Sequence, residues 1–250
     1  HRGENEVVAG GDSGLWQAVS GERLWRQLHD EVLAMVQDVA PVPGQTGWLA
    51  ATAYGVHAAV VGDHGALRWR PLVDGLANRN ARFTTRLLAL EPADRGWLVA
   101  TEDGLWITDR ACRQWRRTAI AGTAVRALLR GQRGLWAGTD AGGLWHSDDG
   151  DGWSELVGAG PGEPLLALAE LPEGGLLAGT TTGAVRGDGS GSWERLGPPT
   201  AVISLAVSRE QQGLWAFGAS PGGLWWTDDG GARWTQVIEV PGGVGSVLAP

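Results

Sequence analysis

A glycine-flanked tryptophan motif recurs along the 250-residue chain, and its spacing limits the possible folds more than any other feature. The clearest copy is GLWWTDDGGARW, which runs from Gly223 to Trp234. The last tryptophan of the motif aligns at six positions: Trp25, Trp69, Trp115, Trp153, Trp193 and Trp234. The spacings are 44, 46, 38, 40 and 41 residues, and the two chain ends together supply a further 41. A period of this size indicates an array of repeated structural units.

Each repeat contains four short segments that favour β-strands. The first is apolar, as in VISLAV from Val202 to Val207, and the second reads like GLWAGT from Gly134 to Thr139. The third is the GLW segment, and the fourth begins near the aligned tryptophan. Strands of this length between Gly, Pro and Asp, without a helical period, predict an all-β array. The 41 glycines fit many tight turns, and 15 tryptophans against two phenylalanines fit one aromatic type at repeated sites.

A four-stranded unit of this size matches one blade of a β-propeller, and radial closure removes the exposed sheet edges. The sequence therefore predicts one six-bladed β-propeller of four-stranded antiparallel blades over residues 1–250. Residues 1–28 supply only strands two to four of a blade, whereas GVGSVLAP, from Gly243 to Pro250, has the pattern of the missing inner strand. We expect this segment to complete the N-terminal blade and close the ring. The expected blades are 244–250 with 1–28, then 29–72, 82–118, 123–156, 163–196 and 200–237.

The turn TDDGGARW is suited to a hairpin, because Asp and Thr oxygens accept backbone N–H groups and glycine allows positive φ. The pattern resembles the Asp-box (BNR) repeat, Ser/Thr-x-Asp-(x)-Gly-x-x-Trp, of sialidases, sortilin-type receptors, xyloglucanases and photosystem II assembly-factor propellers. The resemblance implies a propeller whose boxes lie at the blade periphery, away from the ligand face. The structural box residues are Thr227, Asp229, Gly230 and Trp234; Ser147, Asp149, Gly150 and Trp153; and Asp188, Gly189 and Trp193.

Three other copies of the box are degenerate. In the copy from Thr108 to Trp115 the hydroxyl and the tryptophan are kept, but Arg110 stands where the aspartate is expected. Little more than the tryptophan survives in the copies that end at Trp25 and Trp69.

The sequence lacks the marks of the enzymes that it resembles. There is no Arg-Ile-Pro motif of the sialidase type, and Tyr54, the only tyrosine, has no evident glutamate partner. The related xyloglucanases work between two propellers, and one is predicted here. We therefore expect a non-catalytic binding or scaffold module. A divergent glycoside hydrolase is a second alternative; it needs two converging carboxylates, of which Asp38 on an inner strand is the first to test.

Charge is distributed unevenly along the chain. The net charge is −8, which disfavours nucleic acid as a partner. From Arg68 to Arg133 there are 13 arginines against six acids, but from Gly134 to Pro250 there are four against 14. This asymmetry predicts an oriented surface for a protein partner. The predicted contact residues lie in one column of the inner strands and in inter-blade loops, where binding commonly occurs: Arg86, Arg126 and Gln37, then Arg79, Arg82, Arg116 and Arg117.

A carbohydrate is the first alternative ligand. Fourteen tryptophans fall in repeat columns, where packing explains them, whereas Trp226 follows Trp225 directly and faces the other side of its strand. Trp226 is therefore the candidate stacking residue of a lectin-like propeller.

No metal and no cofactor are predicted. The aspartates of SDDGDG (Ser147–Gly152) carry ligands that calcium prefers, but turn capping explains them, and His57 and His64 lack a third ligand.

The lone Cys112 excludes an intramolecular disulfide. No apolar run reaches the length of a membrane helix, so membrane insertion is not expected. The sequence assigns neither a compartment nor an oligomeric state, and it fits a monomeric domain or part of a larger chain or complex.

Overall fold

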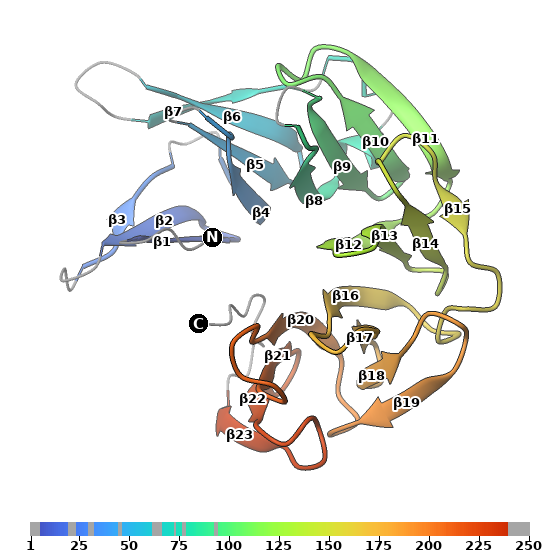
Figure 1. Cartoon of the computed structure of the whole chain (residues 1–250). Helices are drawn as coiled ribbons and strands as arrows, with labels where there is room; N and C mark the ends of the chain where they lie inside the picture. The colour runs from blue at the N-terminus through green and yellow to red at the C-terminus, as the bar shows by residue number, and fades with distance from the viewer. Residues whose placement is uncertain are drawn as a thin grey trace. The chain divides into compact units, whose positions relative to one another are not determined.

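The structure is a computed structural model that describes residues 6–19, 24–29, 33–44, 47–61, 67–72, 74–76, 79–92 and 95–239. Its internal contacts divide the chain into two compact units, His1–Val125 and Arg126–Pro250. Both units consist of antiparallel sheets in which strands that are consecutive in the sequence pair with each other (Figure 1). Short polar connections allow this meander, because antiparallel neighbours need only a tight turn between them.

The first unit holds three sheets and one helical turn, α1 (Arg79–Arg82). Its sheets run in the orders β1-β2-β3, β4-β5-β6-β7 and β8-β9-β10-β11. The strands are β1 (Glu6–Gly11), β2 (Gly14–Val19), β3 (Arg26–Gln27), β4 (Val36–Pro41), β5 (Trp48–Thr52), β6 (Gly55–Val61), β7 (Leu67–Pro71), β8 (Thr84–Ala89), β9 (Trp97–Thr101), β10 (Gly104–Thr108) and β11 (Trp115–Ala121).

The second unit holds three further four-stranded sheets, and its first strand begins at the boundary between the units. The strands are β12 (Val125–Gly131), β13 (Gly134–Thr139), β14 (Leu144–Ser147), β15 (Ser154–Glu155), β16 (Leu165–Glu170), β17 (Leu176–Thr180), β18 (Ala184–Gly187), β19 (Trp193–Leu196), β20 (Val202–Val207), β21 (Trp215–Ala219), β22 (Gly223–Thr227) and β23 (Thr235–Ile238).

The predicted all-β class and the four-strand repeat are confirmed. The sheet formed by β1, β2 and β3 has three strands among the described residues, as predicted for residues 1–28. The segment predicted to supply its inner strand, Gly243–Pro250, lies outside the described residues, so ring closure through it stays a prediction.

Consecutive sheets within a unit share hydrophobic cores. One core combines Leu49 of β5 with Trp97 and Val99 of β9. In the second unit, Leu177 of β17 packs with Trp215 of β21. Within each unit, consecutive sheets thus bury apolar faces against each other, and burial of apolar area at about 25 cal/mol per Å² drives this stacking.

A buried threonine is the last residue of the second strand in several sheets. Thr52 Oγ1 donates to Gly55 O at 2.9 Å, and Thr101 and Thr180 make the same contact with Gly104 and Gly183. The hydroxyl oxygen also accepts a backbone N–H of the turn, from Tyr54 in the first case. These buried hydroxyls fix the turn between the second and third strands.

Side-chain hydrogen bonds hold the hairpin turns between the third and fourth strands, as the Thr, Asp and Gly pattern predicts. Thr227 Oγ1 donates to Asp229 and accepts Gly231 N–H at 3.1 Å, while the indole N–H of Trp234 donates to Gly231 O. In the corresponding turn, Trp153 donates to Gly150 O at 2.9 Å. A glycine with φ near 90° stands three residues before each tryptophan.

The Thr108–Trp115 turn departs from the pattern in two ways. Asp109, and not the residue at position 110, accepts the backbone N–H groups of Arg113 and Gln114, at 2.7 and 2.8 Å. Cys112 takes the position that glycine fills elsewhere, with φ of 54°. The prediction that this copy lacks its aspartate is therefore wrong. Asp109, one residue before Arg110, makes the hydrogen bonds that the aspartate makes in the other copies.

The structure predicts an unreactive Cys112 thiol. Cys112 is buried, and burial together with the nearby Asp109 carboxylate raises its pKa to about 12. The thiolate is the reactive species, so labelling by a disulfide reagent at about pH 8 should be roughly a thousandfold slower in the native protein than in urea. Comparable rates in both states would contradict this burial.

Thr84 ties two neighbouring sheets through a pair of buried hydrogen bonds. Its hydroxyl accepts Thr52 N–H at 2.8 Å and donates to Thr52 O at 2.9 Å. Thr84→Val keeps the shape but leaves both groups without this partner, so the free energy of unfolding should fall by about 2 kcal/mol. Urea denaturation followed by tryptophan fluorescence measures the change. Thr235→Val, at an exposed position, is the control and should have little effect.

Candidate functional site

The long connection between β7 and β8 lies against the third and fourth strands of the following sheet. Leu76 and Ala81 form a small core with Trp106 of β10, and Trp115 of β11 packs against it. This core holds α1, which carries Arg79 and Arg82, against the β8–β11 sheet, where it contacts β9 and also β6 of the preceding sheet. Arg82 is exposed, and of Arg79 only the backbone is described.

Arg117 belongs to the same region but is not a free charge. Its guanidinium lies 5.5 Å from the centre of the Trp106 ring. It also forms an ion pair with Asp103 and donates to the Asp103 backbone carbonyl at 2.7 Å. Arg116, next to it on β11, is exposed. The predicted residues Arg82, Arg116 and Arg117 all belong to the first unit, but Arg116 and Arg117 are consecutive residues of β11 and face opposite sides of its sheet. A shared contact surface for them stays a prediction.

The inner-strand column differs from the prediction by one residue. A β-bulge lies between Val36 and Asp38 in β4, and another between Thr84 and Arg86 in β8. Asp38 pairs with Ala51 and Arg86 pairs with Ala100, at corresponding positions of their sheets. Arg86 therefore shares its column with Asp38, whereas Gln37 sits in the bulge and is exposed. The spacing of the sequence alone does not reveal a bulge.

Asp38 joins β4 to β8. Its Oδ2 accepts the N–H of Leu87 at 2.9 Å, and its Oδ1 accepts the N–H of Val39 at 2.9 Å. Burial raises the pKa of Asp38, and the positive charge of Arg86 and these two N–H groups oppose the rise without cancelling it. Arg86 itself donates to Thr85 O at 2.8 Å. Both carboxylate oxygens thus accept backbone N–H groups, and Oδ2 holds β4 and β8 together.

Arg126 lies on β12 in the second unit and is also paired. Its Nε contacts both carboxylate oxygens of Asp140, at 3.0 and 3.1 Å, and its Nη2 contacts one of them at 2.9 Å. This bidentate contact fixes the guanidinium plane and neutralises its charge. Arg126 is therefore not available as an isolated cation at this position.

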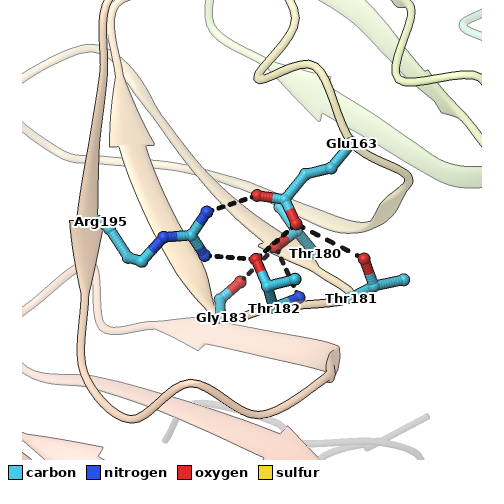
Figure 2. Close-up of polar contacts among 6 residues, drawn as sticks. All are labelled: Glu163, Thr180, Thr181, Thr182, Gly183 and Arg195. Carbon is cyan, nitrogen blue, oxygen red and sulfur yellow. Dashed lines mark hydrogen bonds and ion pairs between the residues drawn. The ribbon is translucent and has the colours of Figure 1, made fainter.

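A second polar cluster in the same unit surrounds Glu163 (Figure 2). Arg195 donates to Glu163 Oε1 at 2.6 Å and to the hydroxyl of Thr182 at 2.6 Å. The Thr182 hydroxyl donates in turn to Glu163 Oε2 at 2.6 Å, and Thr181 approaches the same oxygen at 3.4 Å. The loop before β16, the β17–β18 turn and β19 meet at this one carboxylate.

The hydrogen bonds at Glu163 determine its protonation. Burial by itself raises its pKa, but the bonds from Thr182, Arg195 and Thr180 outweigh burial and hold the pKa below its usual value. Glu163 is thus ionised at neutral pH and has no proton to donate. The cluster is suited to fixing the blade end and not to general-acid chemistry.

Comparison with known proteins yields matches only among solved structures, because no family model and no curated protein matches the chain. A Niastella koreensis GH74 enzyme matches with a TM-score of 0.66 and 13% identity, over 92% of this chain and 43% of its own. PorZ, a surface component of the type-IX secretion system of Porphyromonas gingivalis, matches with 0.61 and 16%, over 99% and 33%. YCF48 bound to a D1 peptide matches with 0.64 and 16%, over 94% and 78%.

The fold is a six-bladed β-propeller. At these identities the likeness extends to the fold alone. The propeller spans less than half of the GH74 and PorZ chains. Its neighbours include enzymes as well as binding and assembly proteins.

Trp226 lies on a blade face that has a packing role elsewhere in the propeller. It pairs with Ala216, as Arg186 pairs with Leu177 and His146 with Trp136. Leu177 and Trp136 are buried in cores that include the following blade. Trp226 is 36% exposed. It therefore lies on the face that, in the two preceding blades, packs against the next blade. A glycan contact through Trp226 stays a prediction.

The sequence interpretation missed the arginines of the outer strands. Arg68 and Arg70 on β7 and Arg113 in the turn before β11 are exposed, and their guanidinium groups have no ion pair within the described part of the propeller. Their alternation with buried Trp69 could have revealed the first two, because alternate residues of a strand face opposite sides.

The remaining candidates are ordinary structural residues or carry no site. His57 is buried near Thr52, and His64 lies outside the described residues. Across the described ranges no group of three His, Cys, Asp or Glu side chains is placed to hold a metal ion. The same ranges contain no helix that is long and apolar enough to cross a membrane.

Glu163 should contribute to stability only where it is ionised. Glu163→Gln removes the ion pair with Arg195, so the free energy of unfolding at pH 7 should fall by about 1 kcal/mol, since Arg195 is half exposed and solvent screens the pair. Because the folded pKa is lowered, this contribution is present above the unfolded pKa of about 4.3 and is lost as pH falls through the folded pKa. The difference between wild type and variant should therefore shrink toward pH 3 in urea titrations. Glu210→Gln, at an exposed position, should show no such trend.

Proposed function

We propose that this propeller is a non-catalytic, protein-binding module that recognises an acidic surface of its partner through exposed arginines of the first unit. The observation that carries the proposal is the set of arginines without an ion pair there: Arg68, Arg70, Arg82 and Arg113. The propeller identity with Asp-box-like turns supports a rigid scaffold, and such scaffolds commonly present binding groups at loops and edges.

The position of these arginines favours recognition by charge. Arg68 and Arg70 lie on the outer strand of one sheet, Arg113 precedes the outer strand of the next, and the connection carrying Arg82 leads from the first of these strands to β8, the inner strand of the next sheet. Complementary charge at such a surface mainly sets orientation and the rate of association. Arg117 is paired with Asp103, and Arg86 donates to Thr85 O and lowers the pKa of Asp38 through its charge, so they would support the surface more than contact a partner.

A glycoside hydrolase is less well supported than a binding module. Its general acid must hold a proton and lie across from a second carboxylate. Glu163 is ionised by its hydrogen bonds, and both oxygens of Asp38 accept backbone N–H groups. These carboxylates already have structural partners. A lectin-like role through Trp226 competes with the packing role of its blade face.

Charge reversal tests the proposal. The probe is a fluorescein-labelled decaglutamate peptide, and the triple variant carries Arg70→Glu, Arg82→Glu and Arg113→Glu. Anisotropy should show binding by the wild type, and the variant should bind at least about tenfold more weakly. Raising the salt concentration from about 50 to about 500 mM should weaken wild-type binding, because exposed charges are screened.

The matched control changes the same three arginines to lysine, which keeps the charge and should preserve most of the affinity. Two results would overturn the proposal: unchanged affinity after charge reversal, or tighter binding of a single-stranded DNA decamer than of the peptide. The second result would favour a nucleic-acid partner.

A further inference from the structure

The strand β7 presents two arginines on the same side of its sheet. Arg68 pairs with Val60 of β6, and Arg70 pairs with Ala58. Residues two apart on a strand face the same side, so both guanidinium groups extend from the face opposite to buried Trp69. Val60 is 47% exposed, so the described residues leave this end of the two strands partly uncovered.

The charge of these two arginines is not balanced on their own strands. The strands β6 and β7 contain no aspartate or glutamate, and Asp63, in the turn between them, lies outside the described residues. Neither Arg68 nor Arg70 has an ion pair within the part of the chain that the structure describes. The outer strand of the next sheet differs, because its Arg117 is paired with Asp103. β7 therefore carries two arginines at alternate positions whose charge is open to a partner.

β7 is also the last strand of its sheet. The strand order is β4-β5-β6-β7, so β6 pairs with one edge of β7, and no other strand among the described residues pairs with it. The edge of a sheet offers backbone N–H and C=O groups to an added strand. Pro71, which has no N–H, ends β7 on its C-terminal side. The available edge is short, so we expect a short bound segment of modest affinity.

We propose that β7 binds an extended acidic segment of the protein partner as an additional strand. This inference rests on the proposed function, because it names how the same arginine surface recognises an acidic partner. Two carboxylates that lie two residues apart in the segment share one side of the added strand, where cross-strand neighbours of Arg68 and Arg70 are found. Backbone pairing sets the register, and the arginines select acidic side chains at alternate positions.

An acidic strand fits this edge better than two other occupants. A second copy of β7 would bring arginine beside arginine, and like charges on opposed strands are destabilising. A nucleic-acid strand would satisfy the charge, but it lacks the regularly spaced N–H and C=O groups that pair with a sheet edge. An acidic peptide strand satisfies the edge and the two arginines together.

Two peptides of the same composition test the inference. Both are fluorescein-labelled heptapeptides of threonine that contain two glutamates. In the alternating peptide the glutamates are two residues apart, and in its isomer they are adjacent. Only the alternating peptide can place both carboxylates on the arginine side of β7. Anisotropy should show that the full-length protein binds it about threefold more tightly than the isomer, as one additional exposed ion pair allows.

Backbone methylation of the alternating peptide separates strand addition from attraction by charge alone. Alternate N–H groups of a strand point to opposite edges, so only one set faces β7. One version carries N-methyl groups at the glutamates and the other at the threonines, with the same charge. One of the two should lose most of its affinity and the other should keep it.

Variants of the protein locate the contact. Arg68→Gln and Arg70→Gln should each abolish the preference for the alternating peptide, and Arg68→Lys should keep most of it. Arg113→Gln is the matched control, because it removes the same charge from the arginine surface at a residue outside β7. It should weaken both peptides alike and leave their ratio unchanged. Melting temperatures check that each variant is folded.

The outcomes separate this inference from the proposed function. If the two peptides bind equally while decaglutamate binding is still lost in the triple charge-reversal variant, the added strand is wrong and the arginine surface stands. If decaglutamate does not bind either, both are wrong. The added strand is also overturned by a preference that survives in the Arg68→Gln and Arg70→Gln double variant, by methylated peptides that bind alike, or by no binding of the alternating peptide up to about 1 mM.

Discussion

The constraint on which this structure depends is that a sheet of four short strands cannot bury its own apolar face. In a repeat protein, stacking against a neighbouring unit buries this face, so each sheet must cover its face with the next sheet. Leu177 of one sheet and Trp215 of the following one lie in a shared core, and Leu49 and Trp97 repeat the arrangement in the first unit. Stability is therefore a property of consecutive pairs of sheets, and a change at one interface affects two blades.

Hydrogen bonds of the indole N–H explain why tryptophan, and not phenylalanine, fills repeated positions at the fourth strands. The buried indole N–H groups of the second- and third-strand residues Trp106, Trp136, Trp215 and Trp225 have no such partner within the described residues. The indole N–H of Trp69 donates to Leu28 O, and that of Trp193 donates to Ala159 O, in each case to backbone that follows the preceding sheet. Trp153 and Trp234 use the same group to close their own turns. A phenylalanine would provide the apolar surface but would leave these carbonyls without a donor, at a cost of about 1–3 kcal/mol when they are buried.

The features that could be predicted from the sequence are those that recur in it. Strand positions follow from apolar segments between glycines, and β20 was expected at the residues where it occurs. The bulge before Arg86 has no local signature, because it depends on pairing with β9. The partners of Arg117 and Arg126 lie 14 residues away in each case, on turns whose direction only the folded backbone defines. Charge counts therefore predicted a basic surface but could not separate structural arginines from free ones.

The distinction between paired and unpaired arginines changes how net charge relates to recognition in this propeller. The half from Gly134 to Pro250 is strongly acidic by count, yet Arg209 within it and Arg133 just before it have no ion pair within the described residues, whereas Glu170, Asp188 and Glu194 have structural partners. A charge that is already paired costs desolvation when a ligand covers it and gains little in return. An unpaired arginine also loses water when a ligand covers it, but it gains a new partner in return. Recognition should therefore follow the unpaired groups, Arg133 and Arg209 here, more closely than the sign of the surrounding chain.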